Sequence, residues 1–407
     1  MSKIRYLTKA IEELSFSDHK MAFLAGPRQC GKTTLSKMML SDRGYGNYNN
    51  WDDTNFRRAW TKNPNSVIPE TNNKIPLIIL DEIHKAKMWK RNLKGIFDTL
   101  TSPADILVTG SARLNIYKKG SDSLQGRYFS YRLHPFTLRE METPKNISSD
   151  ELIDNIFSDS ITYTAAQRQN YETIFRFGGF PEPLFAQNTA KARLWRRGRI
   201  EKVVHEDIRD LSNIPELSRI DMMVSLMPER IGSLFSLNSL REDLEVSYDT
   251  VKRWYNLLCE LYYSFTIRPY TKKIVRALKK EGKSYLWDFA EITNEASRFE
   301  NLVACHLLKS CNYWTDIGEG TFELYYLRNK EKEEIDFLIT KDGVPWLPIE
   351  AKLNDKEPTS SWKKFLSYIP CKRGIQIIHD SNYRKVHKIG NAEILIISAD
   401  RLLQYFI

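Results

Sequence analysis

The chain has 407 residues, which is more than one hydrophobic core usually contains, so its length predicts about two or three domains. Hydrophobic residues make up 42% of the chain and charged residues 28%, a balance typical of a soluble globular protein rather than a disordered one. The formal net charge of +10 permits a polyanionic partner such as nucleic acid without requiring one.

The five cysteines are scattered and include no Cys-x-x-Cys pair, which argues against disulfides and a structural zinc site. The N-terminal segment MSKIRYLTKAIEELSF is charged and amphipathic and has no apolar signal core. No apolar run approaches the ~20 residues that span a bilayer. We therefore expect a soluble cytoplasmic protein that does not associate with a membrane.

The first predicted element is a strand that leads into a phosphate-binding loop. The apolar run MAFLAG ends in glycine, as a buried parallel strand does, and TLSKMML has a helical pattern. Between them, the glycines of Gly-x4-Gly-Lys-Thr let the backbone wrap an anion, and the loop N–H groups and the helix N-terminus point at it. We expect Lys32 to reach the β- and γ-phosphates of a nucleotide and the Thr33 hydroxyl to bind Mg²⁺. The predicted nucleotide-binding residues of this segment are Gly26, Pro27, Arg28, Gln29, Cys30, Gly31, Lys32, Thr33 and Thr34.

Polar residues end the next two apolar strands. Asp81 and Glu82 follow the run PLIIL. The Asp81 carboxylate is expected to hold Mg²⁺, and Glu82 to orient and deprotonate the attacking water. Thr109 ends the run ADILVT. In a parallel sheet its side chain emerges at the carboxyl edge beside the phosphates, where it can sense the γ-phosphate.

Two arginines are candidates for the cation that stabilises the charge of the transition state. Arg113 follows the third strand, and Arg127 lies in the segment SLQGRYFSYRL. The alternative is that both are ordinary surface residues. A catalytic Arg127 would act either within one chain or between the chains of an oligomer, and the sequence leaves these two cases open.

The middle of the chain is predicted to contain a helix-turn-helix. Helical patterns at residues 239–244 and 248–262 are separated by a tight turn, and Ser247 is a good N-cap for the second helix. The segments SFTIRPYT and KSYLWDF are expected to form the two strands of a wing, with the basic turn Lys279–Lys283 at its tip. This arrangement favours DNA binding. The alternative is a helical pair that packs only within its own protein.

The last third of the chain has the order helix, strands, helix, strand, which is typical of a restriction-type nuclease core. Asp336 lies on one predicted strand, and Glu350 and Lys352 lie two residues apart on the next, hence on one face. We expect Asp336 and Glu350 to share Mg²⁺ ions that activate water, and Lys352 to offset charge on the scissile phosphate. Glu300, on the preceding helix, is the expected further carboxylate, and Gln376 is a supporting polar residue. The alternative is a salt bridge between strands.

The segments GPRQCGKTTL, LDEIHK, ILVTGS, LHPFTLRE and GGFPEPL together resemble the archaeal-type AAA ATPase family of prokaryotes. In that family an AAA ATPase core is joined to a C-terminal domain of unknown function that is related to PD-(D/E)XK restriction-type nucleases. The resemblance covers nearly the whole chain, in order. It implies ATP binding and hydrolysis by Lys32, Thr33, Asp81 and Glu82, with Thr109 as the sensor.

We therefore predict an α/β fold in several parts. They are a P-loop AAA-type ATPase core with a parallel sheet (1–145), a helical lid or linker (146–225), a winged-helix-like domain (226–290) and a PD-(D/E)XK nuclease-like domain (291–407). The expected function is ATP binding and hydrolysis by a DNA-associated protein whose nucleotide state gates Mg²⁺-dependent cleavage. The alternative is an ATP-driven switch that binds DNA or protein partners and whose nuclease-like domain is inactive. ATP and Mg²⁺ are the expected cofactors.

Overall fold

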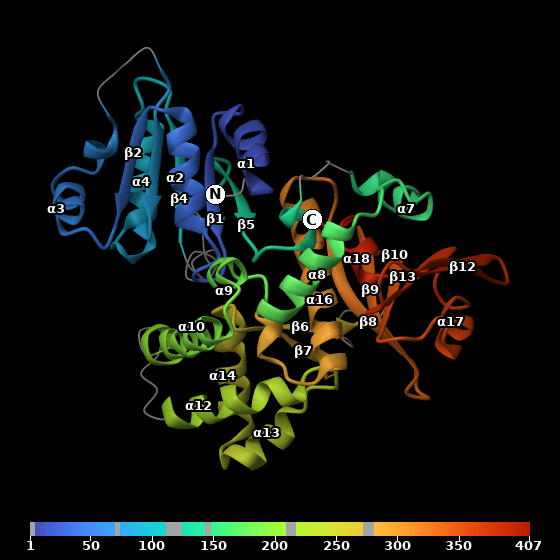
Figure 1. The fold of residues 1–407 in the computed structure, drawn as a ribbon. Coiled ribbons are helices and arrows are strands. Elements are labelled where there is room, and N and C mark those ends of the chain that lie inside the picture. Colours follow the sequence, from blue (N-terminus) through green and yellow to red (C-terminus); the bar gives the residue numbers. More distant parts are fainter. Residues whose placement is uncertain (1–4, 70–73, 111–123, 143–147, 209–216, 272–280) are drawn as a thin grey trace. The chain divides into compact units, whose positions relative to one another are not determined.

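The computed structural model describes residues 5–69, 74–110, 124–142, 148–208, 217–271 and 281–407. The chain folds into two compact units, Met1–Pro135 and Phe136–Ile407 (Figure 1). The N-terminal unit ends at Pro135, whereas the sequence predicts a boundary at residue 145. Within the ranges given above, no helix is both long enough and apolar enough to cross a bilayer.

A parallel sheet forms the centre of the N-terminal unit. Five strands in its described part pair in the order β2-β3-β4-β1-β5, and each neighbouring pair is parallel. Strands β1, β3 and β4 are buried along their whole length, as expected for parallel strands that are covered on both faces. The bounds are β1 Met21–Ala25, β2 Gly46–Asn50, β3 Leu77–Asp81, β4 Asp105–Thr109 and β5 Tyr128–Arg132.

The helices of this unit pack on the sheet. Polar residues lie at the carboxyl edge of the sheet, where its strands end. Apolar side chains of the helices, among them Trp60 and Trp89, share one core with Phe23 of β1. Asp81 pairs directly with Thr109 across β3 and β4, so these two strand ends are neighbours. The helix bounds are α1 Leu7–Ala10, α2 Lys32–Arg43, α3 Thr54–Lys62 and α4 Trp89–Asp98.

The C-terminal unit is built on a mixed sheet. Eight strands among its described residues pair in the order β12-β13-β11-β10-β9-β8-β6-β7. The pairs β10/β11, β11/β13 and β6/β8 are parallel, and the other neighbours are antiparallel. The bounds are β6 Ser264–Pro269, β7 Lys283–Leu286, β8 Phe322–Arg328, β9 Glu334–Lys341, β10 Val344–Lys352, β11 Arg373–Ile378, β12 Arg384–Ile389 and β13 Ala392–Ser398.

Helices of the C-terminal unit lie before, between and after these strands. Helix α16 packs against β8, β9 and β10 and buries apolar residues along most of its length. The bounds are α6 Leu138–Met141, α7 Ser149–Phe157, α8 Ala165–Phe177, α9 Pro181–Ala186, α10 Thr189–Glu201, α12 Leu217–Leu226, α13 Leu237–Leu244, α14 Tyr248–Glu260, α16 Glu295–Asp316, α17 Ser360–Phe365 and α18 Ala399–Leu402.

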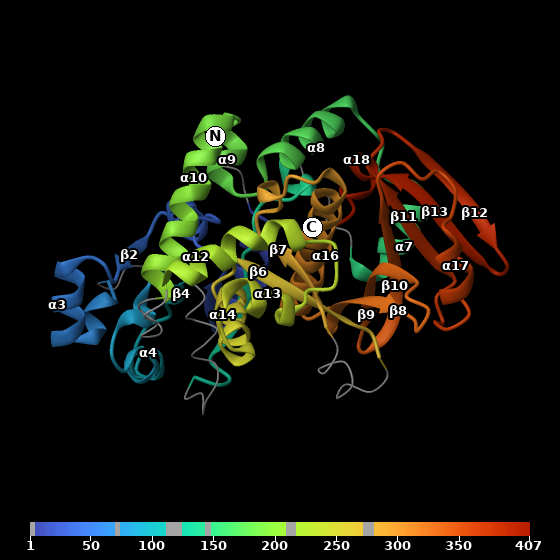
Figure 2. The same ribbon diagram turned by 90° about the horizontal axis from the view of Figure 1, so that it is seen from below.

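Helices α13 and α14 form the helix pair that the sequence predicts; they pack against each other, and α14 also contacts β6 (Figures 1 and 2). Ser247 caps α14, because its hydroxyl oxygen accepts a hydrogen bond from the N–H of Thr250 at 3.2 Å. The side chains of Val251, Trp254 and Leu258 are buried, and their spacing of three or four residues places them on one face of the helix.

The two strands predicted as a wing belong to the large sheet instead. They are β6 and β7, which pair with each other antiparallel as expected. Strand β6 also pairs with β8, where Arg268 lies opposite Tyr325, so the wing is not a separate hairpin. Lys279 and Lys280 lie outside the described residues. Lys283 is buried at the start of β7, so its predicted place at an exposed wing tip is wrong.

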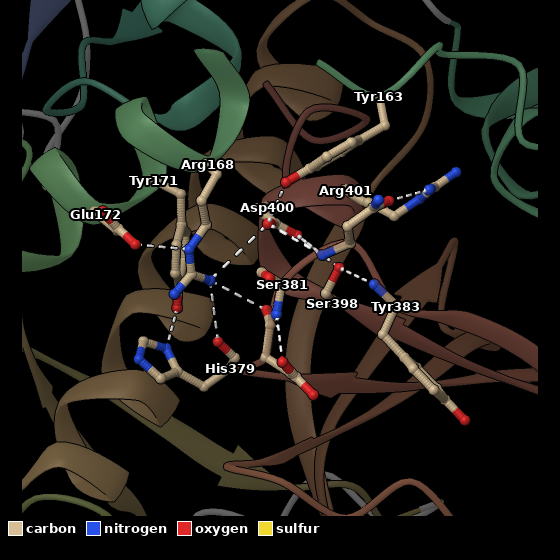
Figure 3. Close-up of polar contacts among 12 residues, drawn as sticks. Tyr163, Arg168, Tyr171, Glu172, His379, Ser381, Tyr383, Ser398, Asp400 and Arg401 are labelled. Atoms are coloured by element: carbon tan, nitrogen blue, oxygen red, sulfur yellow. Dashed lines mark hydrogen bonds and ion pairs between the residues drawn. The ribbon is translucent and has the colours of Figure 1, made fainter. Parts of the chain in front are cut away.

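A buried polar network connects α8 and the residues just before it to α18 and the residues that follow β11 (Figure 3). The fully buried Asp400 carboxylate, at the start of α18, accepts a hydrogen bond from the Tyr163 hydroxyl at 3.0 Å. Arg168 of α8 donates to the carbonyl oxygen of His379 at 3.3 Å, and the Tyr171 hydroxyl contacts Nδ1 of the same histidine. Since these groups are partnered by one another, the network is typical of a structural joint rather than of a ligand site.

Candidate functional site

The loop after β1 has the backbone geometry that a phosphate loop requires. Gly26 has φ +155°, and a Cβ atom there would lie 2.3 Å from the carbonyl oxygen of Leu133, so a larger residue does not fit. Gly31 has φ +100° and is the N-cap residue of α2. Cys30 is fully buried, and its carbonyl oxygen accepts a hydrogen bond from the Arg5 guanidinium at 2.8 Å. The loop is therefore fixed by its glycines and by a buried arginine.

Lys32 is the first residue of α2, and its side chain folds over the loop. Its ammonium group donates hydrogen bonds to the carbonyl oxygens of Gly26 at 2.9 Å and Pro27 at 2.7 Å. The N-terminus of α2 adds positive potential at the same place. A cation and a helix N-terminus together can bind an anionic phosphate. Of the other predicted loop residues, Pro27 is buried, Arg28 is half-buried, and Gln29, Thr33 and Thr34 are exposed.

Three of the described hydroxyl groups converge on the Asp81 carboxylate at the carboxyl edge of the sheet. Thr33 donates to Oδ2 at 2.9 Å, Tyr48 donates to the same oxygen at 2.6 Å, and Thr109 donates to Oδ1. A threonine hydroxyl and a carboxylate oxygen are the hard oxygen ligands that Mg²⁺ prefers. Thr33 and Asp81 therefore fit the ion that the sequence leads us to expect.

Tyr48 also belongs to this cluster, although no sequence motif marks it. It lies on β2, whose residues GNYNN lack the alternation of apolar and polar residues that marks a strand. Burial, followed by the hydrogen bond to Asp81, raises the pKa of Tyr48 to about 12. The hydroxyl therefore stays protonated and continues to donate at neutral pH. The parallel pairing of β2 with β3 is what brings Tyr48 to this edge.

Glu82 follows Asp81 directly, and its own backbone conformation is strained. Its φ of +58° lies in the left-handed region, which non-glycine residues rarely adopt. Its N–H donates to the carbonyl oxygen of Thr109 at 2.9 Å, which holds the turn against β4. Its carboxylate lies 3.5 Å from the Lys85 ammonium, and its side chain is 20% exposed. Glu82 is therefore reachable by water at the edge where a general base is expected.

Arg127 lies at the opposite edge of the sheet from the phosphate loop. It directly precedes β5, whose first residue pairs with Met21 at the amino end of β1, whereas the loop follows Ala25 at the carboxyl end. At about 3.3 Å per residue, the strands separate these edges by more than about 13 Å. Arg127 also forms two hydrogen bonds with Asp98, at 2.6 and 2.9 Å. In this position Arg127 pairs with Asp98 and lies away from the phosphate loop of its own chain, and Arg113 lies outside the described residues.

The predicted nuclease residues on β9 and β10 lie close together. The Lys352 ammonium is 3.1 Å from Oε1 of Glu350 and 3.9 Å from Oδ2 of Asp336. The other oxygen of Glu350 accepts a hydrogen bond from the Thr359 hydroxyl at 2.5 Å. Gln376 lies directly opposite Glu350 in the parallel β10/β11 pair and accepts a hydrogen bond from the Thr359 N–H at 3.2 Å.

Lys283 occupies the centre of this carboxylate cluster, although the sequence analysis places it in a different domain. The residue is 2% exposed. Its ammonium lies 3.0 Å from Oε1 of Glu300 and 3.1 Å from Oδ1 of Asp336, and it also contacts Glu334. The Tyr285 hydroxyl donates to the same oxygen of Glu300 at 2.7 Å. Lys283, Tyr285 and Glu334 also contact these carboxylates or belong to them, and no sequence motif marks these three residues.

Burial dominates the electrostatics of the cluster. Burial, and then the nearby charge of Asp336, raise the pKa of Glu300 to about 7. Burial also raises the pKa of Glu350, against the opposing effect of Lys352. Burial by itself would lower the pKa of Lys283, but the groups around it outweigh this effect and raise the pKa well above its usual value. Lys283 is therefore a permanent cation within the cluster.

This donor set does not fit a divalent metal ion in the arrangement observed. A metal ion needs carboxylate oxygens that are available for coordination. Here the Lys283 ammonium already contacts Glu300, Glu334 and Asp336. No group of three or more His, Cys, Asp or Glu side chains in the described part of the chain is arranged to hold a metal ion. The contacts are those of a buried ion network.

Comparison with known families decides the class of the N-terminal unit. Residues 18–142 match the family model of an AAA domain. The N-terminal unit is an AAA-type P-loop core. After this AAA core in the sequence, residues 168–296 and 297–394 match the family models of two domains of unknown function, DUF8612 and DUF4143. The border between these two matches falls inside α16, so it separates β6 and β7 from the rest of the sheet to which they belong.

Relatives extend over most of the chain. An uncharacterized protein of Haemophilus influenzae is 22% identical over 370 residues, which cover 84% of each chain. An uncharacterized protein of Mycobacterium tuberculosis is 22% identical over 333 residues, which cover 80% of this chain and 69% of that protein.

Two solved structures are similar to the chain at a low level. The Aeropyrum pernix ORC1 protein in complex with DNA has a TM-score of 0.31 and 14% identity, covering 74% of this chain and 93% of that chain. The AMPPCP-bound DnaA of Aquifex aeolicus has a TM-score of 0.30 and 15% identity, covering 62% of this chain and 86% of that chain. Both scores are too low to support a conclusion about this chain.

Proposed function

We propose that the AAA core binds ATP and hydrolyses it. The observation that carries this proposal is the meeting of Lys32, Thr33 and Asp81 at the carboxyl edge of the parallel sheet. Ligands of open α/β sheets bind outside this edge. The loop glycines keep the backbone open to an anion, and the Lys32 ammonium supplies the charge that phosphates attract.

Each residue of the edge has a separate task in this proposal. Lys32 turns from the loop carbonyl oxygens to the phosphates and offsets charge on the transferring phosphoryl group. Mg²⁺, when held by Thr33 and Asp81, supplies charge neutralisation between the phosphates. Glu82 orients the attacking water and accepts its proton. Thr109 is hydrogen-bonded to Asp81 and acts as the sensor: it transmits the presence or absence of the γ-phosphate to strand β4.

Replacing Glu82 by glutamine should separate binding from hydrolysis. The amide keeps the size of the side chain but cannot accept the proton of water, so we expect ATP affinity close to that of the wild type and turnover lower by about 10²–10⁴-fold. Phosphate release and the binding of a fluorescent ATP analogue measure the two quantities. Glu13→Gln is the matched control, because Glu13 is 60% exposed on the N-terminal helical segment. An equal loss of affinity and turnover in Glu82→Gln would contradict its role as the base.

We also propose that the C-terminal unit associates with DNA and that the ATPase cycle changes this association. Helix α14 has the position of the recognition helix in a helix-turn-helix, and its Lys252 and Arg253 side chains are exposed. The net charge of +10 adds an attraction to phosphates that does not depend on base sequence. An ATP-driven DNA-binding switch is therefore the function that we favour for the whole chain.

For the eight-stranded sheet, we propose a nuclease-like fold that does not cut DNA. The support is Lys283, whose ammonium takes the place among Glu300, Glu334 and Asp336 where a metal ion would need free oxygens. The rival proposal is Mg²⁺-dependent cleavage gated by ATP. The convergence of Asp336 and Glu350 with Lys352 favours this rival.

Metal titration of the nucleotide-free protein should distinguish these two proposals. We expect calorimetry with Mn²⁺ to give the same result for the wild type and for Asp336→Asn, and plasmid DNA to remain uncut with Mn²⁺ and ATP. Lys283 already neutralises the carboxylates, so the metal ion gains little by displacing it. A Mn²⁺ site that is lost in Asp336→Asn, together with DNA cleavage that the same variant abolishes, would establish the rival proposal.

A further inference from the structure

A pocket of about 200 Å³ opens between α14 and β6 in the C-terminal unit. Tyr248, Lys252 and Asn256 are spaced four residues apart along α14, so they share one face of the helix. Together with Thr266 and Arg268, which are two residues apart and exposed on β6, they line this pocket. Residues of a helix face and of a strand face therefore meet around one concave site.

The inner wall of the pocket is aromatic and firmly held. The rings of Phe235 and Tyr255 stack with centroids 4.6 Å apart. The Tyr255 hydroxyl is 2.7 Å from the Thr266 hydroxyl, so the wall is fixed to β6. Tyr248 also lines the pocket and is 42% exposed, which leaves its ring available to a ligand. An aromatic surface of this kind can stack on a flat, unsaturated group.

The polar groups around the pocket are of two kinds. Lys252 and Arg268 are exposed cations that form no side-chain hydrogen bond or salt bridge within the ranges that the structure describes. Asn238, Asn256 and Glu281 also line the pocket and offer amide and carboxylate groups. Amides and carboxylates recognise the edges of bases, and lysine and arginine bind phosphate.

The size of the pocket narrows the choice of ligand. Pockets for drug-sized molecules have volumes of about 300–1,000 Å³, so about 200 Å³ suits a smaller group such as one base. A site for phosphate alone would gain nothing from the aromatic wall, and the carboxylate of Glu281 would repel the anion. A single base with its neighbouring phosphate uses the aromatic, amide and cationic groups together.

We propose that this pocket receives one unpaired nucleobase of a DNA strand, with the adjoining phosphate bound by Lys252 and Arg268. The proposal rests on the DNA association proposed above and states what α14 and β6 recognise. Tyr248 stacks on the base, and Asn256 binds its edge. The protein should therefore prefer single-stranded DNA, or a duplex with one extrahelical base, to a fully paired duplex of the same length.

Fluorescence anisotropy with three labelled DNA probes tests this proposal. The probes are a short paired duplex, the same duplex with one extrahelical base, and its single strand. We expect the wild type to bind the second and third probes about tenfold more tightly than the first, because stacking on an aromatic side chain contributes on this scale. Tyr248→Ala should remove this preference, so that the variant binds the three probes with similar affinities. Lys252→Ala and Arg268→Ala should each lower the salt slope on the single strand by about 0.7, as expected for one lost phosphate contact.

Two control variants separate the pocket from general DNA binding. Arg253 is exposed on α14 but does not line the pocket, so Arg253→Ala should lower the affinity for all three probes by a similar factor and leave their ratio unchanged. Tyr368 is 74% exposed on another part of the unit, and Tyr368→Ala should behave as the wild type. Equal binding of the three probes, with no effect of Tyr248→Ala, would overturn the pocket proposal and leave DNA association standing. No binding of any probe at low salt would overturn both, whereas ATP hydrolysis is measured independently.

Discussion

Replacing Lys32 by alanine should abolish ATP hydrolysis by the AAA core. The change removes the cation that the loop holds at the carbonyl oxygens of Gly26 and Pro27, so charge on the transferring phosphoryl group is no longer offset. Loss of one electrostatic contact to a transition state lowers kcat by about 10²–10³-fold. We expect at least this loss, together with weaker nucleotide binding. Phosphate release under saturating ATP measures the first effect, and titration with a fluorescent ATP analogue measures the second.

The fold should survive this change, which makes the result interpretable. Lys32 contacts neutral carbonyl oxygens, and water can replace the ammonium there without leaving a buried charge unpaired. Lys62→Ala is the matched control, because it removes the same charge from an exposed position in the last turn of α3. Hydrolysis by Lys32→Ala within a few-fold of the wild-type rate would refute the assignment of the phosphate loop.

The phosphate loop could be predicted from the sequence because its information is local. The glycines, Lys32 and Thr33 follow one another, and a strand precedes them. The place of Asp81 beside Thr33 also follows from a general rule, since the carboxyl ends of parallel strands meet at one edge. The AAA match of residues 18–142 confirms the class of fold that these motifs predict.

The positions of Arg127 and Lys283 could not be predicted, because they depend on pairings between distant segments or on a strand that the sequence pattern does not reveal. Arg127 precedes a strand, so it lies at the amino edge, but this becomes apparent only when residues 128–132 are known to pair with β1. Lys283 begins a strand beside a basic stretch, and a lysine there is normally expected in solvent. Lys283 contacts Glu300 of α16 and Asp336 of β9 only in the folded C-terminal unit, where β6 and β7 belong to the same sheet as β9.

Replacing Lys283 by methionine should destabilise the C-terminal unit more than any exposed substitution. Methionine keeps the length of the side chain but removes the ammonium, which leaves the carboxylates of Glu300, Glu334 and Asp336 without their shared cation. Removal of one partner from a buried ion pair costs about 3–5 kcal/mol. Urea unfolding followed by tryptophan fluorescence measures this loss. Lys364→Met is the matched control, because Lys364 pairs with Glu333 at 2.5 Å but its side chain is 54% exposed, so solvent screens the pair and its loss should change stability little.

The loss caused by Lys283→Met should depend on pH in a defined direction. The pKa of Glu300 is about 7 in the folded protein against 4.5 as its ordinary value, so the folded state binds the proton more tightly. Protonation of Glu300 therefore contributes to the stability of the folded state fully below pH 4.5, and this contribution is lost as the pH rises through about 7. Without the ammonium, the pKa of Glu300 rises further, so the destabilisation should be larger near pH 8 than near pH 5.

Adding Mn²⁺ to Lys283→Met then distinguishes an ion network from a metal site. If the carboxylates serve only to hold the lysine, Mn²⁺ should leave the unfolding midpoint of the variant unchanged at each pH. If Mn²⁺ restores the midpoint, the carboxylates can bind a metal ion, and cleavage by Asp336, Glu350 and Lys352 becomes the better proposal for this domain. Loss of a buried cation with three carboxylate partners should lower the stability of the fold. If Lys283→Met is as stable as Lys364→Met, Lys283 is not required by the fold and the interpretation as a buried ion network is wrong.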